Sequence, residues 1–149
     1  QVHSRDNGRM PMQWDDSRYA GFAAEDSAEP WIAVNGNHVR VNAADQLKDE
    51  DSIFHYYQKL IALRKELDVI AYGDIEPLAE HDPSVFAYRR IYEGHELVMV
   101  ANFYGKEYTW KGAPELEGFR KVLGNYQGEE TTEGAAMVLK PYEAAVWYK

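Results

Sequence analysis

The sequence predicts a mainly β chain, in which an antiparallel β sandwich follows a long loop and one α-helix. Three observations support this prediction. Residues 1–50 are rich in turn-forming residues, residues 51–67 repeat apolar side chains at helical spacing, and short β-rich runs recur after Gly73. Short strands separated by regular turns are typical of antiparallel sandwiches and barrels, not of parallel sheets.

The predicted loop covers residues 1–50 and shows little periodicity. Its turn signals are Asn7-Gly8, Pro11, Gly21, Pro30 and Asn35-Gly36. A connection of this length is far longer than the usual one, and loops of that kind commonly carry function.

The helix is predicted from apolar residues that recur at helical offsets over residues 51–67, namely Ile53, Phe54, Tyr57, Leu60, Ile61 and Leu67. Arg64 and Lys65 lie near its end, where the helix dipole favours positive charge. The acidic residues 49–51 before it fit either a capping role or a calcium or general-base site, and we favour capping.

The β sandwich is predicted from six β-rich runs: residues 84–92, 95–103, 107–110, 119–125, 136–141 and 143–148. The first two runs are joined at Glu93-Gly94, which indicates a hairpin. We expect the aromatic side chains within these runs to form core rather than a ligand site; they are Tyr88, Tyr92, Phe103, Trp110 and Trp147.

Composition narrows the function classes. The 149 residues carry a net charge of −9, so the chain is expected to bind neither nucleic acid nor a membrane surface. The sequence contains no cysteine, which excludes disulfides and thiolate metal sites and is more typical of a cytoplasmic location. Because the sequence starts at Gln1 in what reads as the middle of a segment, we expect a natural N-terminus elsewhere.

The common catalytic and cofactor motifs are absent, including the G-x-S-x-G, phosphate-loop and dinucleotide-binding patterns. The histidines are far apart in sequence, so we expect no metal site and no cofactor. The chemistry-bearing residues that remain are Arg5 and Arg9. Their guanidinium groups fit a carboxylate or the hydroxyls of a sugar, with Trp14 and Trp31 offering flat apolar faces. Loop-pinning salt bridges and buried tryptophan plugs are the alternative.

Several segments resemble the C-terminal part of exo-acting α-glucosidases of the α-amylase superfamily, the group of oligo-1,6-glucosidases, dextran glucosidases and trehalose-6-phosphate hydrolases. The segments, in chain order, are SRDNGRMPMQWDD, AGF, PWIAVN, SIFHYYQKLIALRK, VFAYRR and LKPYEAAVWY. The resemblance implies that residues 1–68 are the last loop and eighth helix of a (β/α)8 barrel, and residues 69–149 a C-terminal antiparallel β domain. The helix would then be left over from the barrel, and the missing N-terminal barrel would be its natural partner.

The resemblance also implies a function. The parent enzyme would be a retaining glycoside hydrolase acting on terminal α-glucosidic bonds of short oligosaccharides, with α-1,6 bonds favoured. Its catalytic carboxylates would lie on earlier barrel strands, so no catalytic residue is expected in this chain and the chain alone is expected to be inactive. Arg5 and Arg9 would bind substrate. Gly8 and Met10 replace the alanine and threonine common in the family, which leaves the subsite preference open.

Other readings stay open from the sequence. The parent could be a trehalose-6-phosphate hydrolase, the chain could be a freestanding carbohydrate-binding β module, or the β domain could be a purely structural cap. If Ile53, Phe54, Leu60 and Ile61 face a barrel in the parent, the chain without it is expected to dimerise or to repack this helix.

Overall fold

The computed structural model of the protein describes residues 5–128, 131–133 and 136–149. The chain divides into two compact units, Gln1–Gln58 and Lys59–Lys149, which we call the N-terminal unit and the β unit. The boundary between them falls within helix α2 (Ile53–Glu66), so each unit contains part of this helix.

The N-terminal unit consists mostly of turns and loops, as the sequence predicts. Besides the start of α2, its described regular elements are the short 3-10 helices η1 (Arg5–Gly8) and η2 (Gly36–Val39) and the one-turn helix α1 (Ala43–Gln46). Asn42 caps α1, because its side-chain oxygen accepts a hydrogen bond of 2.9 Å from the backbone N–H of Asp45.

The predicted helix is present as α2, two residues shorter at its start than the predicted range and one shorter at its end. Ser52 lies directly before it and interacts with the His55 backbone N–H, while the Ser52 hydroxyl donates to the Gln46 carbonyl at 2.7 Å. A further short helix, α3 (Asp68–Tyr72), follows and was not predicted. No helix in the described part of the chain is long and apolar enough to cross a membrane.

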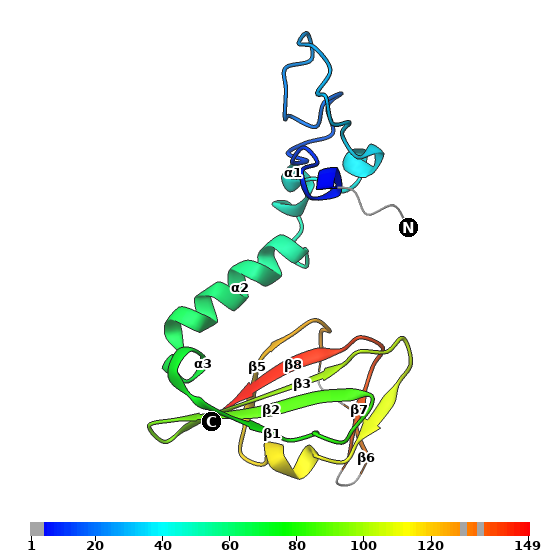
Figure 1. The fold of residues 1–149 in the computed structure, drawn as a ribbon. Coiled ribbons are helices and arrows are strands. Elements are labelled where there is room, and N and C mark those ends of the chain that lie inside the picture. The colour runs from blue at the N-terminus through cyan, green and yellow to red at the C-terminus, as the bar shows by residue number, and fades with distance from the viewer. Residues whose placement is uncertain (1–4, 129–130, 134–135) are drawn as a thin grey trace. The chain divides into compact units, whose positions relative to one another are not determined.

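The β unit is the predicted antiparallel sandwich (Figure 1). Its larger sheet has the order β1-β2-β3-β8-β5, and its smaller sheet the order β4-β7-β6. The strands are β1 (Asp74–Pro77), β2 (Val85–Tyr92), β3 (His95–Asn102), β4 (Tyr108–Trp110), β5 (Arg120–Gly124), β6 (Thr131–Glu133), β7 (Ala136–Leu139) and β8 (Ala144–Tyr148). A 3-10 helix, η3 (Ala113–Leu116), lies between β4 and β5.

The predicted hairpin joins β2 and β3, and Tyr92 pairs with His95 across the turn. Both turn residues have positive φ, 48° for Glu93 and 84° for Gly94. This is the combination required by the two-residue turn whose twist matches that of paired strands.

The larger sheet buries side chains on both faces. One face packs against the smaller sheet and forms the main core, which contains Val85, Ala87, Val98, Val100, Trp110, Met137, Leu139, Ala145 and Trp147. On the other face Leu97 packs with Leu67 and Val69, from the chain around α3. Alternation along β3 explains this division, because Leu97 and Val98 point to opposite faces.

The aromatic residues predicted to be core divide into three groups. Trp110 and Trp147 are buried, and Tyr88 and Tyr92 are partly buried against the smaller cluster. The prediction for Phe103 was wrong, because 64% of its surface is exposed. Phe103 directly follows the last residue of β3, so strand alternation no longer places it in the core.

Candidate functional site

The predicted substrate-binding residues lie at the two ends of η1: Arg5 is its first residue, Arg9 directly follows its last, and both are exposed. The Arg9 guanidinium is 3.9 Å from a carboxylate oxygen of Asp6, and both side chains are about half exposed (50% and 55%). A pair this exposed and this long contributes little to stability. The guanidinium of Arg9 therefore remains accessible to a ligand.

The following segment is fixed by Gln13 and Trp14. The side-chain amide of Gln13 donates to Asn37 Oδ1 at 3.0 Å and to the Val41 carbonyl. The carbonyls of Gln13 and Trp14 accept from the backbone N–H groups of Ala43 and Ala44, each at 2.9 Å. Gln13 thus ties the arginine-bearing segment to the segment around α1, a structural role that the sequence analysis missed.

A tight turn follows at Asp15. Asp15 Oδ1 accepts from the backbone N–H of Ser17 at 3.0 Å and from its hydroxyl at 2.5 Å. These hydrogen bonds lower the pKa of the Asp15 carboxyl from its ordinary value of 3.8, and the bond from the Ser17 hydroxyl has the largest effect. Ala20 and Gly21 have φ of 55° and 63°, and the Ala20 carbonyl accepts from the N–H of Trp14. The turn therefore holds the backbone on the C-terminal side of the arginines.

Trp14 and Trp31 are 54% and 85% exposed. Within this chain, therefore, neither tryptophan is a buried plug under the loop. Their rings are apolar faces of the kind that small-molecule sites use.

The described residues of the N-terminal unit line at least two hollows. One, of about 450 Å³, is lined mainly by apolar residues, Met10, Pro11, Met12 and Phe54 among them. The other, of about 220 Å³, includes Arg18 and His38. The Arg18 guanidinium lies 4.9 Å from the centre of the Tyr19 ring, a cation–π contact. Within the described residues, no group of three or more histidine, cysteine, aspartate or glutamate side chains could hold a metal ion.

Two protein families match two separate parts of the chain. Residues 1–73 match the α-amylase catalytic domain, and residues 85–146 match the C-terminal domain of the α-amylase SusG. The chain belongs to the α-amylase family. Arg5, Arg9 and both hollows lie in the part that matches the catalytic domain, and strands β2 to β8 lie mostly in the part that matches the C-terminal domain.

Two named relatives support this assignment. The chain is 42% identical over 145 residues to an oligo-1,6-glucosidase of Halalkalibacterium halodurans. The aligned residues make up 96% of this chain and 25% of that protein. It is 38% identical over 144 residues to a trehalose-6-phosphate hydrolase of Escherichia coli, covering 97% of this chain and 25% of the relative. The chain therefore spans about a quarter of the length of these relatives.

A solved structure agrees with the sequence comparison. The crystal structure of trehalose-6-phosphate hydrolase from Bacillus licheniformis superposes with a TM-score of 0.86 at 37% identity, over 97% of this chain and 26% of that one. This agreement extends to a mainly antiparallel β domain preceded by a long loop and a helix. The roles of Arg5 and Arg9 stay predictions.

Proposed function

We propose that this chain is part of a retaining α-glucosidase that hydrolyses terminal α-glucosidic bonds of short oligosaccharides, with α-1,6 bonds favoured. The main support is the pair of exposed guanidinium groups, Arg5 and Arg9, on one turn of the segment that matches the α-amylase catalytic domain. Several oligo-1,6-glucosidases at about 40% identity support the choice of substrate.

The residues of this chain would bind and orient the substrate. Each guanidinium presents a rigid fork of donors that fits two neighbouring sugar hydroxyls. Arg5 would contact the terminal glucose and Arg9 the leaving-group side. The nucleophilic carboxylate and the general acid required for retention would come from the missing N-terminal barrel, since loops at one end of a barrel assemble residues from several strands.

Hydrolysis of trehalose 6-phosphate is a second candidate, because trehalose-6-phosphate hydrolases are nearly as similar to this chain. A freestanding carbohydrate-binding β module is a third candidate function.

Kinetics on the longer protein distinguish the two hydrolase candidates, because an α-1,6-glucosidase should have a higher kcat/KM for isomaltose than for trehalose 6-phosphate. The reverse order would overturn the proposal in favour of the second candidate.

The arginine roles are tested in the same longer protein. Arg9→Ala should lower kcat/KM for isomaltose by about tenfold to a hundredfold, the effect of removing one charge-assisted hydrogen bond. Arg40→Ala is the matched control, an exposed arginine of the same unit, and should leave kcat/KM unchanged. Equal losses in both variants would contradict a substrate-binding role for Arg9.

The isolated 149-residue chain should not hydrolyse an aryl α-glucoside, because both carboxylates would be absent. Hydrolysis by rigorously purified chain would overturn that part of the proposal.

A cytoplasmic location, indicated by the lack of cysteine, also stays a prediction.

A further inference from the structure

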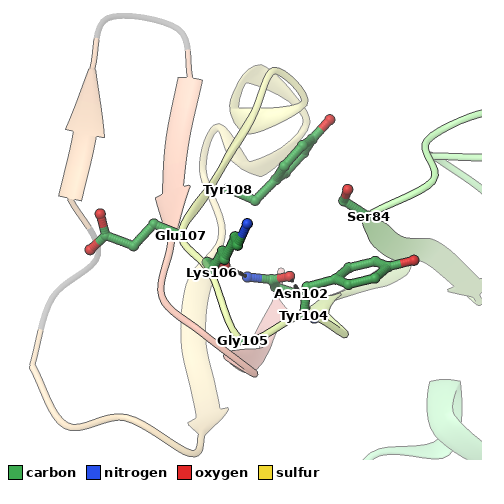
Figure 2. A pocket seen from close by; sticks show the side chains of 7 residues that line it. All are labelled: Ser84, Asn102, Tyr104, Gly105, Lys106, Glu107 and Tyr108. Carbon is green, nitrogen blue, oxygen red and sulfur yellow. Dashed lines mark hydrogen bonds between the residues drawn. The ribbon is translucent and has the colours of Figure 1, made fainter.

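A further cavity lies in the β unit, within the part that matches the C-terminal domain, and no role has been assigned to it (Figure 2). It has a volume of about 410 Å³, which lies within the range of about 300–1,000 Å³ typical of small-molecule sites. Its lining comes from the end of β3, the β3–β4 loop, the start of β4 and the segment before β2.

The cavity combines aromatic and hydroxyl groups. Figure 2 shows Tyr104 and Tyr108 on two sides of the space and Ser84 on a third, while the Glu107 carboxylate points away. Tyr104 is 54% exposed, so its ring is accessible. Rings that are apolar on their faces and carry a hydroxyl suit a ligand with both C–H and O–H groups.

The walls are held in place by hydrogen bonds. Asp82 accepts from the Tyr108 hydroxyl at 2.9 Å and from the backbone N–H groups of Ser84 and Val85 at 2.9 and 3.1 Å. The Tyr108 hydroxyl can therefore still accept a hydrogen bond from a ligand, because its proton is already donated. The hydrogen bond to Asp82 also raises the pKa of the Tyr108 hydroxyl above its ordinary value of 10.0.

The β3–β4 loop is held in place by the side chain of Asn102, which is 2% exposed. Its side-chain amide donates to the carbonyls of Lys106 and Lys140 at 2.8 and 2.9 Å, and its oxygen accepts from the Tyr104 N–H at 3.0 Å. A loop that is already ordered loses little conformational entropy when a ligand binds.

The charges around the cavity favour a neutral ligand. Among the lining residues Lys106 is a cation and Glu107 is an anion, so the lining carries no net charge. An anion such as a phosphate group usually requires an arginine fork or several donors of positive charge, which this lining lacks. A hydroxyl-rich neutral molecule requires only the donors and acceptors already present.

We propose that this cavity binds a neutral mono- or disaccharide, as a site separate from the arginine-bearing loop of the N-terminal unit. A pyranose would place its C–H face on Tyr104 and direct hydroxyls to Ser84, Lys106 and Tyr108. This site does not depend on the proposed hydrolysis, because binding here requires no catalytic carboxylate.

The test is a titration of the 149-residue chain with isomaltose, followed by amide chemical shifts in NMR. We expect saturable shifts centred on residues 102–108, and no saturable shifts with glucose 6-phosphate. Tyr104→Ala should weaken binding at least about tenfold, equivalent to about 1.4 kcal/mol. Tyr57→Ala, an aromatic residue that is 63% exposed on α2, is the matched control and should bind like the original chain.

The fold of each variant is checked from amide shifts remote from the substitution, because Tyr104 contributes backbone hydrogen bonds that alanine retains. Shifts confined to residues 5–42 would place binding on the arginine-bearing loop and overturn the proposal. Unaltered affinity in Tyr104→Ala, or absence of saturation, would overturn it as well. Stronger binding of glucose 6-phosphate than of isomaltose would contradict the neutral ligand class.

Discussion

Gly21 is the clearest case in the N-terminal unit of a residue fixed by backbone geometry. Its φ is 63°, and a Cβ there would lie 2.7 Å from Asp15 Oδ2. Gly21→Ala should therefore destabilise the unit by about 1–3 kcal/mol, measured by urea unfolding. Gly8→Ala is the control, because a Cβ there meets nothing within 4 Å, and it should change stability by less than about 0.5 kcal/mol. Equal effects would contradict the argument.

Asp15 should make the same turn sensitive to acid. Its carboxyl pKa is lowered in the folded chain by the Ser17 hydroxyl, so the carboxylate stabilises the turn above the unfolded pKa of about 3.8. This stabilisation is lost as the pH falls through the lowered pKa. Ser17→Ala should raise the Asp15 pKa toward 3.8 in a carboxyl NMR titration. Ser27→Ala, whose hydroxyl donates to the Ala24 carbonyl, should not change it; a similar shift in both variants would rule out the Ser17 hydrogen bond as the cause.

Residue roles were predictable where a motif is local and not where a contact is distant. Arg5 and Arg9 were selected from a short motif, whereas Gln13 and Asn102 were not. Gln13 reaches Asn37 across 24 positions, and Asn102 reaches Lys140 across 38. Side-chain hydrogen bonds between such distant segments leave no periodic pattern in the sequence. The cavity of the β unit, whose loop Asn102 fixes, was missed for the same reason.

At the level of elements, alternation and length decided what the sequence could reveal. β8 alternates buried and partly exposed residues throughout and β2 does so at its start, whereas β3 is buried on both faces; all three were found because they are runs of five to eight residues rich in apolar and aromatic side chains. β1 was missed because all four of its residues are exposed and one is proline. β6 has three residues and no apolar side chain, and α3 has five, too few for a helical period to show.

Helix α2 supplies the prediction at this scale. It has no buried residue, and Ile53 and Ile61 are 72% and 52% exposed. We expect the isolated chain to self-associate through these side chains, because burying them stabilises association. Sedimentation velocity should show a concentration-dependent mass that Ile61→Lys reduces. Gln58→Lys adds the same charge to the helix without removing an apolar group and should have a smaller effect. A monomer at every concentration, with α2 amides exchanging freely, would contradict the expectation.

At the scale of the whole molecule, the two units differ in how much they bury. The described buried residues of the N-terminal unit are Pro11, Tyr19, Ala20, Asn42 and Ser52, of which two are polar. The β unit has a continuous core between two sheets. Because burial of apolar surface is the main favourable contribution to folding, the β unit should account for most of the stability of the chain.

Native-state hydrogen exchange measures this difference directly. Backbone amides of β2, β3 and β8 should exchange only through unfolding of the β unit, whereas those of residues 11–47 should exchange through smaller openings. Val98→Ala, which removes two methyl groups from a fully buried position, should lower the opening free energy of the β-unit amides by about 1–3 kcal/mol. The amides of residues 11–47 should be unaffected, because their openings do not require the sandwich to unfold. An equal loss of protection in both units would show a single cooperative structure, and the arginine-bearing loop would then depend on the β unit for its order.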